Sequence, residues 1–428
     1  MENPESHIDK STGLFNAMAF DDYLKQIYNE DQECCGIFIS LEESRYYNVN
    51  MGEINDALYE IIEFLRKIPG AKIFKTDYRE ISIIFTDKDK MEEGYRLIED
   101  RFKQEWNTGK DDMSLLLLHP YFLKIPSKSV AENSDDMIMT LKYFKNHIMD
   151  NPEVHCTVVD ENTIEKKKTK EDMISAIVSA LDEDRVEVFY QPIYSTEEKK
   201  FVSAEALVRI RKDDGSLIPP GLFIPVAEET GLILKLGKRV FEKTCQFIKE
   251  NDIQQYGVEY IEVNLSVVQC ENDMLARVYM DIMNKYGVDP KYINLEITES
   301  ASVVLKKTLL KNMDALIKYG VRFSLDDFGN GESNLNYILD MPVDIVKFDR
   351  DMTNAYFENT KAKHVLPAVT NMIKGLELKV VAEGVETEKQ LKTLEELGID
   401  YIQGFYFSRP IKGKEFIEFV KTRNMNKQ

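Results

Sequence analysis

Polar side chains stand near the carboxyl ends of a series of short apolar segments in the C-terminal part of the chain. The segments are rich in β-branched residues, so each is expected to be a strand. An unpaired carboxylate inside an apolar core costs several kcal/mol, and one lysine cannot neutralise five carboxylates. We therefore expect these residues to converge at one end of a barrel and to bind divalent cations there. They are Glu205, Asn264, Glu296, Asp326, Asp327, Lys347, Glu383 and Gln403.

The types of these residues narrow the chemistry. They are mostly hard oxygen donors, with no histidine or cysteine among them, which favours Mg²⁺ or Mn²⁺ over zinc or copper. Adjacent residues of a regular strand face opposite sides, so Asp326 and Asp327 cannot both face inward unless the strand breaks. The following Phe328-Gly329 predicts such a break, which would turn Asp327 toward a second ion. Two ions ~3.5–4 Å apart would hold the attacking and leaving oxygens of a phosphodiester, with Lys347 offsetting charge or holding the water.

Each of these residues also has a simpler interpretation when it is taken alone. A single acid in a strand is more often a salt-bridge partner, Asn264 and Gln403 could be satisfied core amides, and Lys347 could form a structural ion pair. The repetition of polar residues at equivalent strand ends is what favours a common site.

The elements that must position these residues alternate in a regular way. Eight strand candidates cover residues 186–194, 201–210, 260–267, 292–299, 321–329, 343–349, 378–386 and 401–408. Amphipathic helices lie between most of them, and several end at a glycine (Gly287, Gly320, Gly398), as helix C-termini often do. Eight strands alternating with helices over about 230 residues predict a TIM-type α/β barrel. The first two strands have no helix between them, so an irregular opening is expected.

Upstream of the barrel, residues 1–151 mix strand and helix patterns and predict a smaller α+β domain, and residues 152–185 are expected to connect it to a barrel over 186–428. The net charge of −20 disfavours long nucleic acids as partners. No apolar run is long enough to span a membrane and no signal peptide is evident, so we expect a cytoplasmic protein. The five cysteines lack framework or C-x-x-C spacing and are expected to be free thiols.

The barrel segment resembles the EAL family of cyclic di-GMP phosphodiesterases from about residue 172 to 421. The match rests on many ordered motifs: Tyr190-Gln191-Pro192-Ile193, Glu205-Ala206-Leu207-Val208-Arg209, Asn264-Leu265-Ser266, Glu296-Ile297-Thr298-Glu299-Ser300, Asp326-Asp327-Phe328-Gly329, Lys347-Phe348-Asp349, Ala382-Glu383-Gly384-Val385-Glu386 and Gln403-Gly404-Phe405. The resemblance implies hydrolysis of cyclic di-GMP to linear pGpG with two Mg²⁺ or Mn²⁺ ions, and a homodimer.

The resemblance also implies roles for individual residues. One ion would be held by Glu205, Asn264, Glu296 and Asp326, and the second by Asp326 and Asp327. Glu383 would be the general base, acting on the attacking water with Lys347. The dinucleotide would be contacted by Gln191, Arg209, Asp327, Glu386 and Gln403, and the guanidinium of Arg209 suits a phosphate because it donates two hydrogen bonds.

The loop after the aspartate pair departs from the family pattern. The family reads D-F-G-T-G-Y-S-S-L, whereas this chain places Asn330, Glu332 and Asn334 within Asp327–Leu335. Glu299, which anchors this loop in the family and links the metal site to the dimer interface, is retained. The resemblance therefore supports metal binding more directly than dimer-linked activation.

The N-terminal segment resembles a degenerate GGDEF domain, the diguanylate cyclase module often fused to EAL domains. Its start, Ser11-Thr12-Gly13-Leu14-Phe15-Asn16, fits that family. The signature position reads Asp77-Tyr78-Arg79-Glu80-Ile81, without the two glycines that let the backbone approach phosphates, and Ser40 replaces the metal-binding aspartate. We predict no cyclase activity and a regulatory or dimerisation role.

Three functions compete for the barrel. An active phosphodiesterase is favoured because every metal ligand of the resemblance is present. A cyclic di-GMP receptor without turnover, which signals through conformation, is the alternative. An unrelated barrel enzyme acting through an enolate would need an acid–base pair of lysine or histidine, and the strand ends supply only Lys347.

Overall fold

The computed structural model describes residues 4–41, 51–107, 115–149, 155–298, 306–329, 338–339 and 341–425. The chain divides into two compact units, Met1–Thr169 and Lys170–Gln428. Helix α5 (Glu161–Asp182) contains the boundary between them. The strand before it, β8 (Cys156–Val158), pairs with β7 of the N-terminal sheet. The segment expected to connect the halves thus contributes secondary structure to both units.

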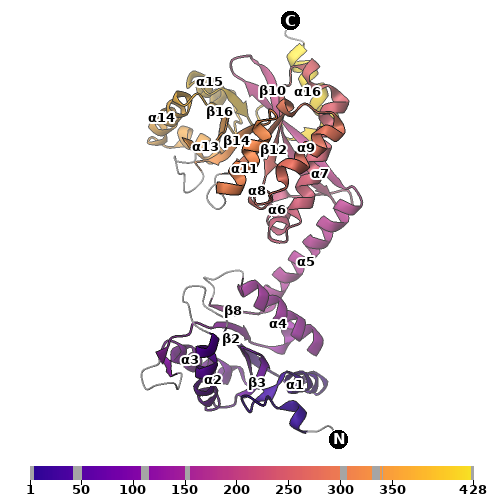
Figure 1. Cartoon of the computed structure of the whole chain (residues 1–428). Coiled ribbons are helices and arrows are strands. Elements are labelled where there is room, and N and C mark those ends of the chain that lie inside the picture. The colour runs from indigo at the N-terminus through magenta and orange to yellow at the C-terminus, as the bar shows by residue number, and fades with distance from the viewer. Residues whose placement is uncertain are drawn as a thin grey trace. The chain divides into compact units, whose positions relative to one another are not determined.

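The N-terminal unit is built on one mixed six-stranded sheet (Figure 1). Its strands alternate apolar residues between two faces, and each face has its own core. Helices α2 and α3 cover one face, and α1 and α4 cover the other. In sheet order the strands are β1 (Phe15–Asn16), β3 (Lys72–Asp77), β4 (Glu80–Phe85), β2 (Cys35–Ser40), β7 (Tyr121–Ile125) and β8. The helices are α1 (Ala17–Asn29), α2 (Met51–Leu65), α3 (Lys88–Phe102) and α4 (Ser134–Met149), and β5 (Trp106–Asn107) pairs with β6 (Leu115–Leu116).

The C-terminal unit is a closed eight-stranded barrel surrounded by helices, which confirms the predicted fold class (Figure 1). The first strand is antiparallel to both of its neighbours, β10 and β17, and the remaining neighbours pair in parallel. The predicted irregular opening is therefore confirmed. The strands are β9 (Val186–Ser195), β10 (Lys200–Arg211), β12 (Tyr260–Leu265), β13 (Ile293–Thr298), β14 (Arg322–Phe328), β15 (Ile345–Phe348), β16 (Lys379–Ala382) and β17 (Tyr401–Gln403).

The barrel helices pack their apolar sides on the strands, and one large cluster of buried residues fills the space between them. Gly287, Gly320 and Gly398 all have positive φ, so they end the preceding helical segments as the sequence predicted. The helices are α6 (Pro220–Glu229), α7 (Ile233–Asn251), α8 (Val267–Cys270), α9 (Leu275–Tyr286), α11 (Lys306–Ile317), α13 (Arg350–Glu358), α14 (Ala362–Gly375), α15 (Glu388–Glu396) and α16 (Gly413–Met425). Two short strands, β11 (Leu217–Ile218) and β18 (Ile411–Lys412), extend the sheet.

Among the helices within the described ranges, none has the length and apolarity that crossing a lipid bilayer requires.

Candidate active site

A single lysine lies at the centre of the barrel's polar cluster. Lys347, on β15, has a side chain that is 0% exposed, although five carboxylates surround its ammonium group. The distances from its Nζ are 2.6 Å to Glu296 Oε1, 2.7 Å to Glu383 Oε1, 3.7 Å to Glu205 Oε2, 3.7 Å to Glu262 Oε2 and 3.8 Å to Asp326 Oδ1. Residues from six different strands or strand ends therefore meet at one point.

The parallel register of the barrel explains this convergence. Asn264 on β12 pairs with Glu296 on β13, and Asp326 on β14 pairs with the last residue of β13. Glu383 directly follows β16 and donates its backbone N–H to Phe348, next to Lys347. The carboxyl ends of parallel strands thus present their polar residues on one rim of the barrel.

Strand β14 ends at Phe328, where the sequence predicted a break, and it also bulges just before that point. Asp327 itself has φ +57°, in the left-handed region that non-glycine residues rarely adopt. The register between β14 and β15 shifts between Leu325 and Phe328. Because of this bulge, Asp326 faces the lysine, and Asp327 is half-buried beside it without joining the ion-pair cluster.

Amide side chains hold Glu205 on the other side of the cluster. Asn264 donates to Glu205 Oε1 at 2.7 Å, and Gln403 donates to Glu205 Oε2 at 2.7 Å. Gln403 also donates to Gln191 Oε1 at 3.3 Å, and Gln191 donates to the Ser408 carbonyl at 3.3 Å. Burial works to raise the pKa of Glu205, but the charge of Lys347 and the two amide hydrogen bonds outweigh it, so the pKa is lowered.

Asp326, Glu383 and Glu296 lie close to other carboxylates, and each binds its proton more tightly than a free carboxyl group does. Burial, with repulsion from neighbouring carboxylates, raises the pKa of Asp326 to about 6 and that of Glu383 to about 8, against the charge of Lys347. The pKa of Glu296 is raised well above its usual value by burial and by the negative charges of Glu262 and Glu205. Burial would lower the pKa of Lys347, but the surrounding carboxylates raise it. One ammonium therefore does not neutralise this cluster.

The donor set fits divalent cations. Buried carboxylate oxygens Asp326 Oδ1 and Glu296 Oε2 accept no hydrogen bond from the described residues. The side chain of Asn264 is exposed at the barrel mouth and binds Glu205 through its amide nitrogen, which leaves its amide oxygen available. Such oxygen donors suit Mg²⁺ or Mn²⁺. Within the described ranges, no group of three or more Asp, Glu, His or Cys side chains is arranged to hold a metal ion, although several carboxylates approach Lys347 Nζ.

The structure places the remaining predicted site residues less centrally. Arg209 on β10 is half-buried, donates to the Val208 carbonyl at 2.8 Å and lies over the Phe189 ring. Glu386 accepts from Arg350 at 3.2 Å on the surface and has no contact with the carboxylate cluster among the described residues. Glu299 and the Asn330–Asn334 segment lie outside the described residues.

Glu262 is the residue that the sequence analysis missed. It lies on β12, is 0% exposed and approaches Lys347 from within the barrel. It belongs to a second polar layer in which Asn294 donates to Glu262 Oε1 at 3.4 Å and to Ser324 Oγ at 2.5 Å. These residues stand two positions before Asn264, Glu296 and Asp326, so they face the same side of their strands. That two-residue spacing was the available signal.

These pKa shifts predict how the stability of the barrel depends on pH after a chelator has removed any metal ions. Carboxyls with raised pKa bind protons more tightly when folded, so their contribution to stability is complete below about pH 4 and is lost as the pH rises through 6 and 8. We expect the free energy of unfolding of the barrel to fall by several kcal/mol between pH 5 and pH 8. Urea unfolding followed by far-UV circular dichroism would measure it. Millimolar Mg²⁺ should flatten the dependence; a metal-free barrel that is equally stable at both pH values would contradict the proposed crowding.

The family model described as "EAL domain" matches residues 174–410, more than half of the chain. The chain is 36% identical to the signaling protein YkoW of Bacillus subtilis over 256 residues, which are 60% of this chain and 32% of YkoW. It is 35% identical to the probable cyclic di-GMP phosphodiesterase PdeB of Escherichia coli over 246 residues, which are 56% of this chain and 46% of PdeB. The matched region therefore spans less than half of these relatives.

Two solved structures are similar to this chain. The structure titled "PaMucR Phosphodiesterase, c-di-GMP complex" is 31% identical, with a TM-score of 0.55, over 57% of this chain and 99% of that chain. The cAMP-bound form of the EAL enzyme Bd1971 is 20% identical, with a TM-score of 0.59, over 91% of this chain and 95% of that chain, a likeness of fold alone. The barrel, its carboxylate-bearing rim and these matches agree, and the chain belongs to the EAL domain family.

Proposed function

We propose that the barrel hydrolyses cyclic di-GMP to linear pGpG with two Mg²⁺ or Mn²⁺ ions. The observation that carries the proposal is the convergence of Glu205, Glu296, Asp326 and Glu383 around Lys347, with buried carboxylate oxygens that accept no hydrogen bond from the described residues. The similarity to PdeB and to the MucR complex supports the substrate. Because one lysine does not neutralise the negative charge of this cluster, bound cations would stabilise it.

In this proposal Glu205, Asn264, Glu296 and Asp326 hold one ion, and Asp326 and Asp327 hold the other. When bound, the ions supply the positive charge that activates a water molecule and offsets the charge of the transition state. The left-handed backbone at Asp327 turns that carboxylate away from the position it would take in a regular strand. The bulge thereby gives two adjacent aspartates access to one rim.

Glu383 is the proposed general base, and Lys347 holds it in place. The 2.7 Å ion pair between them fixes the carboxylate at the end of β16. In the metal-free chain the pKa of Glu383 is raised to about 8, which would leave it protonated and unable to accept a proton at neutral pH. Added positive charge nearby lowers the pKa of a carboxyl, so cation loading would convert Glu383 into a base.

The dinucleotide would be bound by residues beside the cluster. Gln191 and Gln403 form a hydrogen-bonded pair next to Glu205 and present amide groups that suit guanine and ribose. The guanidinium of Arg209 lies on the same strand as Glu205 and can donate two hydrogen bonds to a phosphate. Glu386 would have to leave its surface ion pair with Arg350 to contact substrate.

The N-terminal unit is proposed to be a GGDEF-like domain without cyclase activity. At the signature position, Asp77 ends β3 and Glu80 begins β4 in a tight hairpin without glycine, and Ser40 ends β2 where a metal-binding aspartate is expected. We predict that the purified chain incubated with GTP and Mg²⁺ forms no cyclic di-GMP. Detection of that product by liquid chromatography would contradict the prediction.

Incubation of the full chain with cyclic di-GMP and Mg²⁺ or Mn²⁺, followed by chromatography, tests the hydrolase directly. Formation of pGpG supports the proposal. Tight binding without product would identify a receptor instead, which the lack of a preformed metal cage among the described residues would then explain. Neither binding nor product would contradict both functions.

A further inference from the structure

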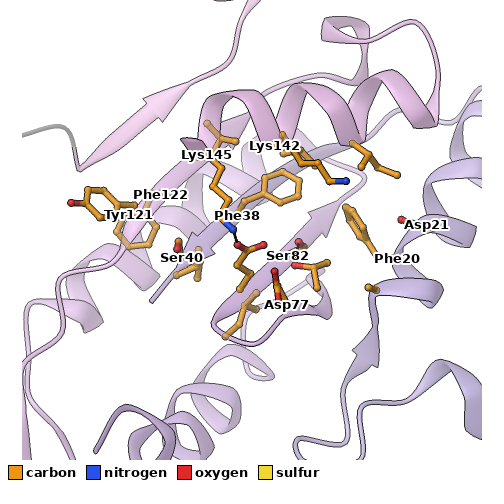
Figure 2. Close-up of a pocket in the computed structure, with 18 residues that line it drawn as sticks. Phe20, Asp21, Phe38, Ser40, Asp77, Ser82, Tyr121, Phe122, Lys142 and Lys145 are labelled. Atoms are coloured by element: carbon orange, nitrogen blue, oxygen red, sulfur yellow. Dashed lines mark hydrogen bonds and ion pairs between the residues drawn. The ribbon is translucent and has the colours of Figure 1, made fainter. Parts of the chain in front are cut away.

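The N-terminal unit contains a cavity of about 350 Å³ between helices α1 and α4 and the sheet (Figure 2). This volume is at the lower end of the range for small-molecule sites, roughly 300–1,000 Å³. The cavity lies wholly within Met1–Thr169, so it belongs to neither the barrel nor its carboxylate cluster. Nothing in the proposed phosphodiesterase chemistry uses it.

The floor of the cavity is formed by four adjacent strands, β3, β4, β2 and β7. In the register of the sheet, Phe38 on β2 lies between Ser82 on β4 and Leu123 on β7. Two residues further along β2, on the same face, Ser40 lies between Glu80 of β4 and Tyr121 of β7. These pairs make one end of the floor apolar and the other end polar.

The walls continue this division. Phe20 of α1 packs edge-on against Phe38, with ring centroids 6.1 Å apart, and Leu141 of α4 also lines the cavity. At the polar end, the hydroxyl oxygen of Ser40 is buried and has no hydrogen-bond partner among the described residues. A buried hydroxyl without a partner is costly, so this atom points to a polar group supplied by a ligand.

The charges on the walls are only partly paired. Lys145 of α4 forms an ion pair with Glu80 on the floor (Figure 2). Lys142, one turn earlier on α4, and Asp21 of α1 also line the cavity, and neither forms an ion pair or hydrogen bond with any described residue. Among the described residues, the cavity therefore offers one unpaired cation, one unpaired anion and one unpaired hydroxyl beside an apolar interior.

We propose that this cavity binds a small zwitterion with an apolar side chain, of the α-amino acid class. Lys142 would bind the carboxylate and Asp21 the ammonium group, both on the α1 side of the cavity (Figure 2). The side chain would extend past Phe20 and Phe38 toward the Ser40 end of the floor. A zwitterion uses both unpaired charges, whereas a simple acid or amine leaves one of them unmatched.

The same charges disfavour a polyphosphate as the occupant. The lining carries three carboxylates, on Asp21, Asp77 and Glu80, against the two ammonium groups of Lys142 and Lys145. A highly charged anion would meet a lining of net negative charge, which the two lysines do not reverse.

Isothermal titration of the full chain with L-phenylalanine and L-leucine tests the proposal. The matched probes are 3-phenylpropionate, which lacks the ammonium group, and phenethylamine, which lacks the carboxylate. We expect at least one amino acid to bind at least tenfold more tightly than either analogue, since each lost charge-assisted hydrogen bond is worth about tenfold or more. Equal affinity for an analogue, no binding of either amino acid, or binding of GTP in their place would overturn the assignment.

Two variants locate the binding in this cavity. Lys142→Met and Asp21→Asn should each weaken binding of the amino acid by at least tenfold. Both residues lie on helix surfaces, where substitutions usually change stability little. The matched control is Lys25→Met, on the exposed side of α1 and outside the cavity lining, which should bind like the wild type. Binding that survives both cavity substitutions would place the amino acid elsewhere. Because the readout is binding by the N-terminal unit, the result is independent of hydrolysis by the barrel.

Discussion

Replacement of Glu383 by glutamine is expected to lower kcat for cyclic di-GMP hydrolysis by roughly 10²–10⁴-fold, the usual contribution of a general base. Glutamine keeps the shape of the side chain and can still contact Lys347, but it cannot accept a proton from water. KM should change by less than about threefold, because the substituted atom acts in the chemical step rather than in binding. Steady-state kinetics at saturating Mg²⁺, with pGpG quantified by chromatography, would measure both constants.

The same variant should leave the fold intact. Without metal ions the carboxyl of Glu383 has its pKa raised to about 8, so at neutral pH it is largely a neutral group like glutamine. The matched control is Glu388→Gln, five positions along the chain, where the carboxylate is exposed and pairs with Lys392 at 2.7 Å. That control should retain full activity. A Glu383→Gln enzyme with kcat within threefold of the wild type would remove Glu383 from the mechanism.

Replacement of Lys347 by methionine should have the largest effect on stability. Methionine has a similar length but no charge, so it leaves five carboxylates with no cation among them. Breaking a buried ion pair by removal of one partner costs about 3–5 kcal/mol, and we expect a loss of that size in chelator at pH 8. The loss should shrink at pH 5, where Asp326 and Glu383 bind protons, and also in millimolar Mg²⁺, which supplies positive charge in place of the ammonium group.

The chain offers an internal reference for this measurement. Its one tryptophan, Trp106, is buried in the core of the N-terminal unit, so its fluorescence follows that unit while far-UV circular dichroism follows both units. Lys374→Met is the matched control, because Lys374 is exposed and donates to the Gly398 carbonyl on the barrel surface. Equal barrel stability of the Lys347→Met variant and the control in chelator would show that the lysine does not hold the cluster together.

The barrel and its rim were predictable because both follow from short-range pattern. Each strand is a run of β-branched residues, and each polar residue near its end stands out against them, as Glu296 does in Ile293–Thr298. Convergence then follows from parallel pairing alone, since equivalent strand ends meet on one rim. This is why Glu205, Glu296 and Asp326 could be grouped from the sequence although more than a hundred residues separate the first from the last.

Other features depend on three-dimensional detail that pattern does not carry. The left-handed conformation of Asp327 arises from a register shift between β14 and β15, which local sequence does not specify. The buried Glu262 looked like an ordinary charged residue in a strand, and only its spacing from Asn264 placed it inside the barrel. The N-terminal cavity is lined by residues of α1, α4 and four strands that are far apart in the sequence, so only the packed structure brings them together.

The central claim is that the carboxylate rim acts on a phosphodiester only with divalent cations. The direct test is to treat the full chain with a chelator, remove the chelator, and follow cyclic di-GMP hydrolysis while Mg²⁺ or Mn²⁺ is added back, alongside the Glu205→Ala variant. We predict no pGpG without metal, restoration as the ions are added, and no restoration in the variant, whose substitution removes the carboxylate that binds Asn264 and Gln403. Hydrolysis that proceeds without metal, or that Glu205→Ala leaves unchanged, would contradict the account.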